Sequence, residues 1–337
     1  MSIRYAVVFA ILTGSAVRAD TPADDFRRAA QAKAAILAKA EVHAFRGADG
    51  FYFLTSELKH YGAGPFWGES AAGVSAATAN QDPLIAILDF QTQLKKAGVQ
   101  LIFVPVPGKA LVDPDKFDAK LRTGARLDAA HQAFFALLRK EGIEVIDLLP
   151  AMLDLRKTGA ESHCKQDSHW SPAATKLAAQ SIARAIKGQP WYAAPMRKIE
   201  RTEEAIEIQG DLVQLLKDNR EPREKLTIER IRMDGKPVTD NRDSPIILMG
   251  DSHTLVYHEP INGSIAANDA GLLDHLAAEL GIAPDMTGVL GSGANASRIT
   301  LARRKDNLAA KKCIVWVIAA RELTESAQGW LKIPVVR

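Results

Sequence analysis

Short apolar runs alternate with segments of helical periodicity through most of this chain, and this alternation limits the folds open to it. The predicted strands are residues 99–106, 143–147, 245–249, 285–290 and 313–319. The helices predicted between or after them are residues 83–96, 126–140, 172–187, 270–280 and 298–311. Strands that alternate with helices pair in parallel and need helices on both faces. The sequence therefore predicts an α/β domain built as a three-layer sandwich around a central parallel sheet.

The first 19 residues have the pattern of a secretory signal peptide. A basic start is followed by an apolar stretch that is too short to span a bilayer. Val17 and Ala19 then occupy the −3 and −1 positions of a cleavage site. We expect residues 1–19 to be removed on export, which leaves residues 20–337 as one catalytic domain.

Three segments lie outside the main alternation of helices and strands. Residues 24–45 have helical periodicity, and residues 51–54 follow a turn and are typical of a short strand. Residues 196–240 are charged and mixed, with only short β-like pieces. We interpret this last segment as an insertion into the α/β domain.

The charge balance excludes nucleic-acid binding as a function class. Without residues 1–19 the chain carries 41 basic and 40 acidic residues, and it has no long basic run. Cys164 and Cys313 are the two cysteines, and an oxidising compartment would permit them to pair. Since they fall at opposite edges of the predicted sheet, a disulfide is disfavoured and its geometry stays open.

Two short motifs supply the groups of a nucleophilic triad. Ser252 follows the buried strand 245–249, so its hydroxyl lies at the carboxyl edge of a parallel sheet, where α/β enzymes do their chemistry. His169 is the best candidate for the base, and Asp167 can orient its ring. We expect Asp251 to shape the turn rather than to react. The motifs are Asp167-Ser168-His169-Trp170 and Gly250-Asp251-Ser252-His253.

The loop after the strand 285–290 supplies candidates for stabilising the oxyanion or binding substrate. A tetrahedral intermediate carries a negative oxygen that needs preorganised donors, and a glycine-rich loop can aim backbone N–H groups at it. We select Gly291, Ser292 and Asn295 of this loop for that role, together with the backbone N–H of Ser252.

Arg321 and Trp170 complete the set of candidate substrate-binding residues. Arg321 follows the strand 313–319, and its guanidinium suits a substrate carboxylate or the developing anion. An ion pair with Glu322 or another acid is the alternative reading of Arg321. Trp170 is either a platform on which a sugar stacks or a core aromatic behind the histidine.

A metal site is a weaker interpretation of the segment around His169. The residue types are right for zinc, but four ligands within seven residues are not typical of a structural site. We therefore expect no metal. The residues concerned are His163, Cys164, Asp167 and His169.

The order of these strand ends resembles the SGNH hydrolase superfamily. Gly-Asp-Ser, Gly-Ser-Gly and Arg-Glu follow the order of its blocks for the nucleophile, the oxyanion glycine and the third oxyanion donor, with Arg321 near the usual asparagine. The Asp–His block, normally last, comes first. This circularly permuted order is similar to that of the periplasmic polysaccharide O-acetyltransferases of the AlgJ/AlgX alginate type. Other stretches that fit this family are residues 49–54, 104–109, 167–170, 271–276 and 315–323.

The resemblance implies a flavodoxin-like SGNH hydrolase domain in the periplasm that acetylates an exported polysaccharide. It also implies a membrane-bound O-acyltransferase as acetyl donor, association with an inner-membrane secretion complex, and no cofactor or metal. Two departures from the family stand out. His253 follows the nucleophile where a small or aromatic residue is expected, and the chain leaves no room for the carbohydrate-binding module of the AlgX branch, which favours the AlgJ-like form.

Two other functions stay open at this stage. A carbohydrate esterase or deacetylase would use the same triad with water as the final acceptor. A non-catalytic scaffold of a polysaccharide-secretion complex would not need the triad, so the joint presence of Ser252, His169 and Asp167 counts against it.

Overall fold

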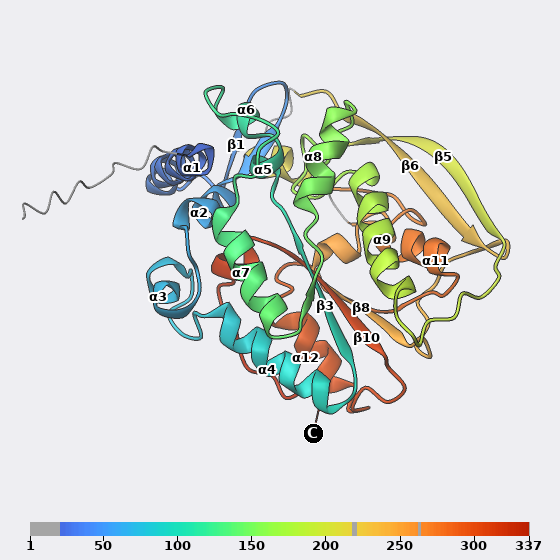
Figure 1. The fold of residues 1–337 in the computed structure, drawn as a ribbon. Coiled ribbons are helices and arrows are strands. Elements are labelled where there is room, and N and C mark those ends of the chain that lie inside the picture. Colours follow the sequence, from blue (N-terminus) through green and yellow to red (C-terminus); the bar gives the residue numbers. More distant parts are fainter. Residues whose placement is uncertain (1–20, 218–220, 262–263, 337) are drawn as a thin grey trace, which may run out of the picture.

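The computed structural model describes residues 21–217, 221–261 and 264–336, and the predicted signal peptide lies outside these ranges. A sheet of five parallel strands lies at the centre, in the order β4-β3-β10-β8-β9 (Figure 1). This confirms the predicted parallel sheet. The strands are β3 (Gln100–Val106), β4 (Glu144–Val145), β8 (Ile246–Gly250), β9 (Asp285–Gly288) and β10 (Cys313–Ala319).

The central strand β10 is buried along its whole length because helices cover both faces of the sheet. Its side chains alternate between two cores, with Trp316 in one and Val315 and Val317 in the other. The Trp316 face is covered by α4 (Pro83–Lys96), α7 (Ala129–Lys140) and α12 (Ala296–Arg303) (Figure 1). The opposite face is covered by α8 (Leu149–Lys157), α9 (Pro172–Lys187) and α11 (Leu272–Leu280).

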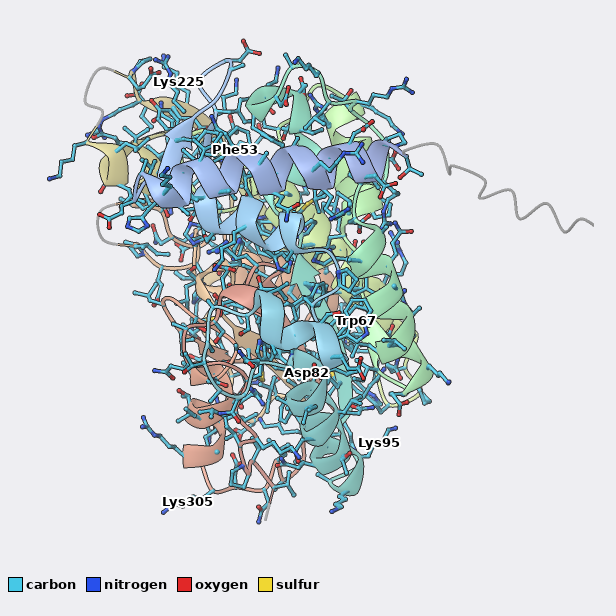
Figure 2. All side chains as sticks on the ribbon, turned by 90° about the vertical axis from the view of Figure 1, so that its left-hand side faces the viewer. Phe53, Trp67, Asp82, Lys95, Lys225 and Lys305 are labelled. Carbon is cyan, nitrogen blue, oxygen red and sulfur yellow. The ribbon has the colours of Figure 1, made fainter. Side chains whose placement is uncertain are left out.

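The amino-terminal part of the described chain forms a layer beside the main sandwich. The helix α1 (Pro22–Lys39) packs along α2 (Thr55–Ala63) (Figure 2). The predicted helix 24–45 was too long at its carboxyl end, because Glu41 has a positive φ of 53° and the chain turns there. The chain then pairs β1 (Ala44–Arg46) with β2 (Tyr52–Leu54) in an antiparallel ribbon.

The predicted boundaries of α4 agree with the structure because strong local signals mark both ends. Asp82 caps the helix by accepting a hydrogen bond from the Leu84 N–H at 2.9 Å, and proline opens its first turn. Lys95 lies in the last turn, where a cation is favoured, and Figure 2 labels it with Asp82 at the other end of this helix.

Residues 196–240 form a three-stranded antiparallel sheet of their own. Its strands are β5 (Ile199–Ile208), β6 (Glu224–Met233) and β7 (Lys236–Pro237), and α10 (Asp211–Leu216) lies between β5 and β6. Ile228 and Ile231 of β6 are buried in the core shared with α9 and α11. That this segment is an insertion stays a prediction.

The predicted helix 298–311 was wrong in its second half, because α12 ends at Arg303. Lys305, Asn307, Leu308 and Ala310 all have positive φ, which helical backbone does not permit. The remaining short elements are η1 (Gly68–Ser70), α3 (Ala71–Val74), α5 (Lys109–Val112), α6 (Pro114–Phe117), η2 (Ser252–Thr254) and α13 (Glu322–Glu325).

None of the helices within the described ranges is both long and apolar enough to pass through a bilayer.

Candidate active site

Ser252 comes two residues after the last residue of β8 and begins the short helix η2 at the carboxyl edge of the sheet. A Cβ on Gly250 would lie 1.9 Å from the carbonyl oxygen of Val317, so only glycine fits the end of this strand. Asp251 then fixes the turn, since its carboxylate accepts hydrogen bonds from the N–H of His253 at 2.9 Å and the N–H of Ala319 at 2.6 Å. The structure thus gives Asp251 the turn-shaping contacts expected from the sequence.

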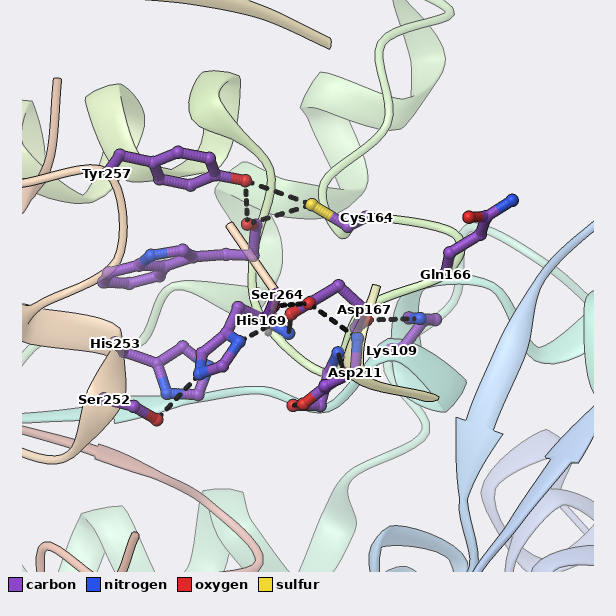
Figure 3. Close-up of polar contacts among 12 residues, drawn as sticks. Lys109, Cys164, Gln166, Asp167, His169, Asp211, Ser252, His253, Tyr257 and Ser264 are labelled. Atoms are coloured by element: carbon purple, nitrogen blue, oxygen red, sulfur yellow. Dashed lines mark hydrogen bonds and ion pairs between the residues drawn. The ribbon is translucent and has the colours of Figure 1, made fainter. Parts of the chain in front are cut away.

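His169 and Asp167 lie on the loop before α9, close to Ser252 (Figure 3). The Nε2 of His169 is 2.7 Å from the Oγ of Ser252, and its Nδ1 is 2.6 Å from an Asp167 oxygen. A carboxylate only accepts hydrogen bonds, so Nδ1 carries the proton and Nε2 accepts from the serine hydroxyl. The structure therefore brings the three predicted triad residues into one line of hydrogen bonds.

The carboxylate of Asp167 is fully buried and saturated with donors. One oxygen accepts from the N–H and the Nδ1–H of His169, and the other accepts from the N–H of Asp211 at 3.0 Å and from the hydroxyl of Ser264. Burial would raise the pKa of Asp167, but the neighbouring His169 and these hydrogen bonds hold it well below its usual range. Asp167 therefore stays ionised and able to stabilise a protonated imidazole.

Lys109 supports the same loop from the other side. Its buried ammonium donates to the carbonyl oxygens of Tyr52 at 2.7 Å and Lys165 at 3.1 Å. It also donates to the carbonyl oxygen of Asp167 at 2.8 Å (Figure 3). Burial lowers the pKa of Lys109. Three carbonyl oxygens from two distant segments are thus gathered around one side chain, and the backbone of Asp167 is one of them.

Sequence reasoning missed Lys109, Asp211 and Ser264 as partners of the triad acid. Lys109 entered only as part of a stretch that resembles the family, and Asp211 lies in the segment interpreted as an insertion. Ser264 belongs to none of the motifs singled out in the sequence. A helix-starting Gly-Asp pair in an otherwise charged segment was the one local signal available for Asp211.

His253 forms a second Asp-x-His pair beside the first. Its Nδ1 is 2.9 Å from an oxygen of Asp251, and its ring centroid is 5.0 Å from the His169 ring. Burial lowers the pKa of His253, so the ring stays neutral next to the base. Trp170 packs edge-on against His253 at 5.2 Å and is fully buried, so it is a core aromatic and offers no face to a sugar.

The loop after β9 meets the expectations only in part. Gly291 and Ser292 are exposed, and the hydroxyl of Ser292 donates to Glu322. Asn295 is not at the oxyanion position, because its side-chain amide donates to the carbonyl of Gly329 at 2.8 Å and its oxygen accepts from the N–H of Leu331 at 3.0 Å. This buried asparagine fastens the loop to the carboxyl-terminal segment instead.

Gly293 of this loop lies against the turn that carries Ser252. A Cβ there would lie 2.7 Å from the backbone nitrogen of Asp251, which is closer than real contacts permit. The glycine was not selected from the sequence, although the Gly-Ser-Gly run contains it. Its position lets the loop pack directly on the turn that carries Ser252.

Arg321 is half-buried just after β10, at the same edge of the sheet as Ser252. Among residues 21–217, 221–261 and 264–336, its guanidinium has neither an ion pair nor a hydrogen bond, so the alternative of a structural pair with Glu322 is not met. Its positive charge nevertheless acts on the buried Glu57, where it is the largest charge effect that lowers the pKa, and on His253 and Glu322. A cation without a partner at this edge is available to an anionic group of a ligand.

One group of potential metal ligands coincides with the triad. Ligand-type atoms of Asp167, His169 and Asp211 lie within 4.8 Å of one another. Each residue already uses such atoms in the hydrogen bonds to Ser168, Ser252 and Ser264 and to one another. These hydrogen bonds are sufficient to explain why the three side chains lie so close together.

A family model described as the SGNH hydrolase-like domain of the acetyltransferase AlgX matches residues 66–284, which include the three triad positions. The match covers more than half of the chain. The chain belongs to this AlgX-type SGNH hydrolase-like family. The suspected resemblance and the predicted fold class are thereby confirmed.

Sequence relatives and solved structures agree with this family assignment. A probable alginate O-acetylase AlgJ of Pseudomonas aeruginosa is 28% identical over 137 residues, which are 40% of this chain and 34% of the relative. The alginate biosynthesis protein AlgX of Pseudomonas syringae is 31% identical over 110 residues, 32% of this chain and 22% of the relative. The matched part thus spans about a third or less of the length of these relatives.

The solved O-acetyltransferase domain of Pseudomonas putida AlgJ superposes with a TM-score of 0.63 at 21% identity, covering 83% of this chain and 92% of that domain. Pseudomonas aeruginosa AlgX superposes with a TM-score of 0.60 at 18% identity, covering 82% of this chain and 61% of AlgX. At this level of identity the likeness establishes a shared SGNH hydrolase-like fold.

Proposed function

We propose that this chain is a periplasmic O-acetyltransferase that transfers acetyl groups to an exported polysaccharide through an acetyl-serine intermediate. The observation that carries the proposal is the hydrogen-bonded line from Asp167 through His169 to Ser252, in a chain of the AlgX-type family. Since the sequence relatives are named alginate O-acetylases, alginate is the first acceptor to test. In this proposal the acetyl donor is a membrane-bound O-acyltransferase of a secretion complex.

In the first half of the reaction, His169 takes the hydroxyl proton while Ser252 Oγ bonds to the acetyl carbonyl carbon. The carbonyl oxygen becomes an oxyanion near the backbone N–H of Ser252. When the tetrahedral intermediate collapses, the bond to the donor breaks and His169 returns the proton to the leaving group. Asp167 stays ionised and stabilises the imidazolium throughout.

In the second half, a polysaccharide hydroxyl replaces the donor. His169 removes its proton while its oxygen attacks the acetyl carbon, and the Ser252 Oγ–acetyl bond breaks with the proton returning to Oγ. No cofactor or metal takes part in either half. Water attacking the same acetyl-serine would make the protein an esterase, so the acceptor decides between the two activities.

The function is tested with p-nitrophenyl acetate as donor, with and without alginate oligosaccharides. We expect mass spectrometry to find acetylated oligosaccharide and a transient acetyl group on the Ser252 peptide. Acetate as the sole product, at a rate that no sugar changes, would show an esterase. If neither p-nitrophenol release nor an acetylated peptide is detected, the protein is a non-catalytic scaffold.

The activity should rise with pH as His169 loses its proton. Burial lowers the pKa of His169, but the charge and hydrogen bond of Asp167 outweigh it, so the pKa lies above the ordinary histidine value. Neutral His169 is the active base, hence the acidic limb of the rate profile should have its midpoint above that value. Asp167→Asn should move this limb to lower pH and slow the reaction, as measured by initial rates from pH 5 to 9.

The exposed His43 provides the control for this profile. His43→Gln should keep both the limb and the plateau of the wild-type protein. An Asp167→Asn profile with an unmoved limb would contradict the assignment of His169 as the titrating base.

Arg321→Ala should slow acetyl transfer by about a hundredfold to a thousandfold and leave the protein folded. The guanidinium has no partner among the described residues whose loss would weaken the fold, whereas an oxyanion donor contributes about this much to kcat. A drop confined to kcat assigns Arg321 to the oxyanion, and a rise in KM for acidic oligosaccharides assigns it to substrate carboxylates. Arg303→Ala, an exposed arginine of α12, is the matched control, and equal rates for both variants would remove Arg321 from the site.

A further inference from the structure

We propose that Asp211 is a positioning residue of the triad, a second carboxylate that fixes the peptide between acid and base and strengthens His169 as a base. The inference rests on the proposed function, which it deepens. Asp211 begins α10 in the antiparallel segment at residues 196–240, outside both sequence motifs. Figure 3 shows it close to Asp167.

The backbone of this segment reaches the triad acid because Gly210 precedes Asp211. A Cβ on Gly210 would lie 2.1 Å from the carbonyl oxygen of Gln166 and 2.6 Å from the nitrogen of Asp167, so any larger residue would push the two segments apart. The close approach lets the N–H of Asp211 donate to Asp167 Oδ2 at 3.0 Å and the N–H of Leu212 donate to the Gln166 carbonyl at 3.2 Å.

The side chain of Asp211 binds the residue that joins the acid to the base. Its two oxygens accept from the N–H of Ser168 at 2.7 Å and from the Ser168 hydroxyl at 2.5 Å. Since Ser168 is the middle residue of the Asp-x-His motif, these bonds fix the relative orientation of Asp167 and His169. A substitution that removed these bonds to Ser168 would loosen Asp167 and His169 together.

Glu224 extends the same support along the loop. Its carboxylate accepts from the N–H of Lys165 at 2.8 Å and the N–H of Gln166 at 2.9 Å, and the Gln166 amide donates to the carbonyl of Pro222 at 2.7 Å. The backbone N–H groups of Lys165, Gln166 and Ser168 are therefore all engaged by this antiparallel segment. The segment acts as a brace for the loop that carries the acid.

The charge of Asp211 also acts on the base. Burial lowers the pKa of His169, and the charges that raise it come from Asp167 first, then Asp211 and Asp251, while the neutral His253 ring lies beside it. Removing one of the three carboxylate charges must weaken proton binding by His169. The other ionisable groups whose charge interacts with Asp167 are Lys109, Cys164, Glu224 and Tyr257.

Asp211→Asn separates the charge from the hydrogen bonds, because an asparagine can still accept from the Ser168 N–H and donate to its hydroxyl. We expect the imidazole titration of His169, followed by NMR in ¹³C-histidine-labelled protein and assigned with His169→Gln, to shift to lower pH. Asp211→Ala removes the bonds as well, and we expect labelling of Ser252 by phenylmethylsulfonyl fluoride to slow by about tenfold as the dyad loosens. Asp234→Asn, which lies in the exposed turn between β6 and β7, is the matched control and should change neither measurement.

An Asp211→Asn titration of His169 that coincides with the wild-type curve, together with unchanged labelling in Asp211→Ala, would overturn the proposal. A merely structural role would lower the melting temperature of the variants but leave the His169 titration in place. Both readouts are independent of the acetyl donor and acceptor. Failure of sugar acetylation in the wild-type protein therefore counts against the proposed function alone.

Discussion

Replacing Ser252 by alanine should reduce acetyl transfer by about four powers of ten or more and leave the protein folded. The hydroxyl oxygen is the atom that forms the acetyl bond, and within the described part of the chain no other hydroxyl is hydrogen-bonded to His169 Nε2. Ser252 is half-buried at the start of η2 and its loss creates no large cavity. The check is p-nitrophenol release and mass spectrometry of the acetylated peptide, with thermal unfolding measured in parallel.

Ser181→Ala is the matched control for this substitution. Ser181 lies within α9, and its hydroxyl donates to the carbonyl of Leu177 at 2.9 Å, so it is not one of the hydroxyls bonded to the triad residues. We expect its activity to equal that of the wild-type protein. Acetylated oligosaccharide made by Ser252→Ala at the wild-type rate would refute the serine as nucleophile.

Lys109→Met should lower the free energy of unfolding by about 3 kcal/mol or more and impair catalysis as well. Methionine keeps most of the buried stem, but three carbonyl oxygens lose a hydrogen bond from the buried ammonium. A hydrogen bond to a charged group contributes about 1.5–3 kcal/mol. One of these carbonyls belongs to Asp167, so its loop should shift relative to Ser252. Urea unfolding gives the stability change, and acetyl transfer measured well below the unfolding transition gives the catalytic effect.

Lys116→Met is the control for Lys109→Met, because it removes a lysine from a solvent-accessible ion pair in the same part of the molecule. Lys116 pairs with Asp49 at 2.6 Å, and the aspartate is largely exposed, so the change should cost less than about 1 kcal/mol. If Lys109→Met and Lys116→Met unfolded at the same urea concentration with equal activity, the buried ammonium would not be the support that its three hydrogen bonds indicate.

The sheet and most of the large helices followed from sequence because local signals and the hydrophobic pattern agreed. The boundaries of α4, α9 and β10 match the prediction at both ends, since Asp82 and Ser171 cap the two helices and the strand is one unbroken apolar run. The end of α12 could not be predicted. Of the residues with positive φ after Arg303, Lys305, Leu308 and Ala310 are of types that normally favour a helix.

The site followed from sequence only where one short motif holds its own partner. Asp167 and His169 are two residues apart, and Ser252 follows a strand, so their meeting could be predicted from topology. The contacts of the triad with residues from other parts of the chain could not be predicted in this way. Asp211 and Lys109 reach the triad through packing of separate elements, and Asn295 is taken up by the carboxyl-terminal segment instead of the oxyanion position.

The two thiols are buried and unpaired, Cys313 at the first residue of β10 and Cys164 beside the hydroxyl of Tyr257. The fold therefore owes none of its stability to a covalent cross-link, and reaching this structure needs no oxidant and no disulfide isomerase. Burial also raises the pKa of both thiols, which protects them from electrophiles. The redox state of the surrounding compartment is thus uncoupled from whether the chain folds.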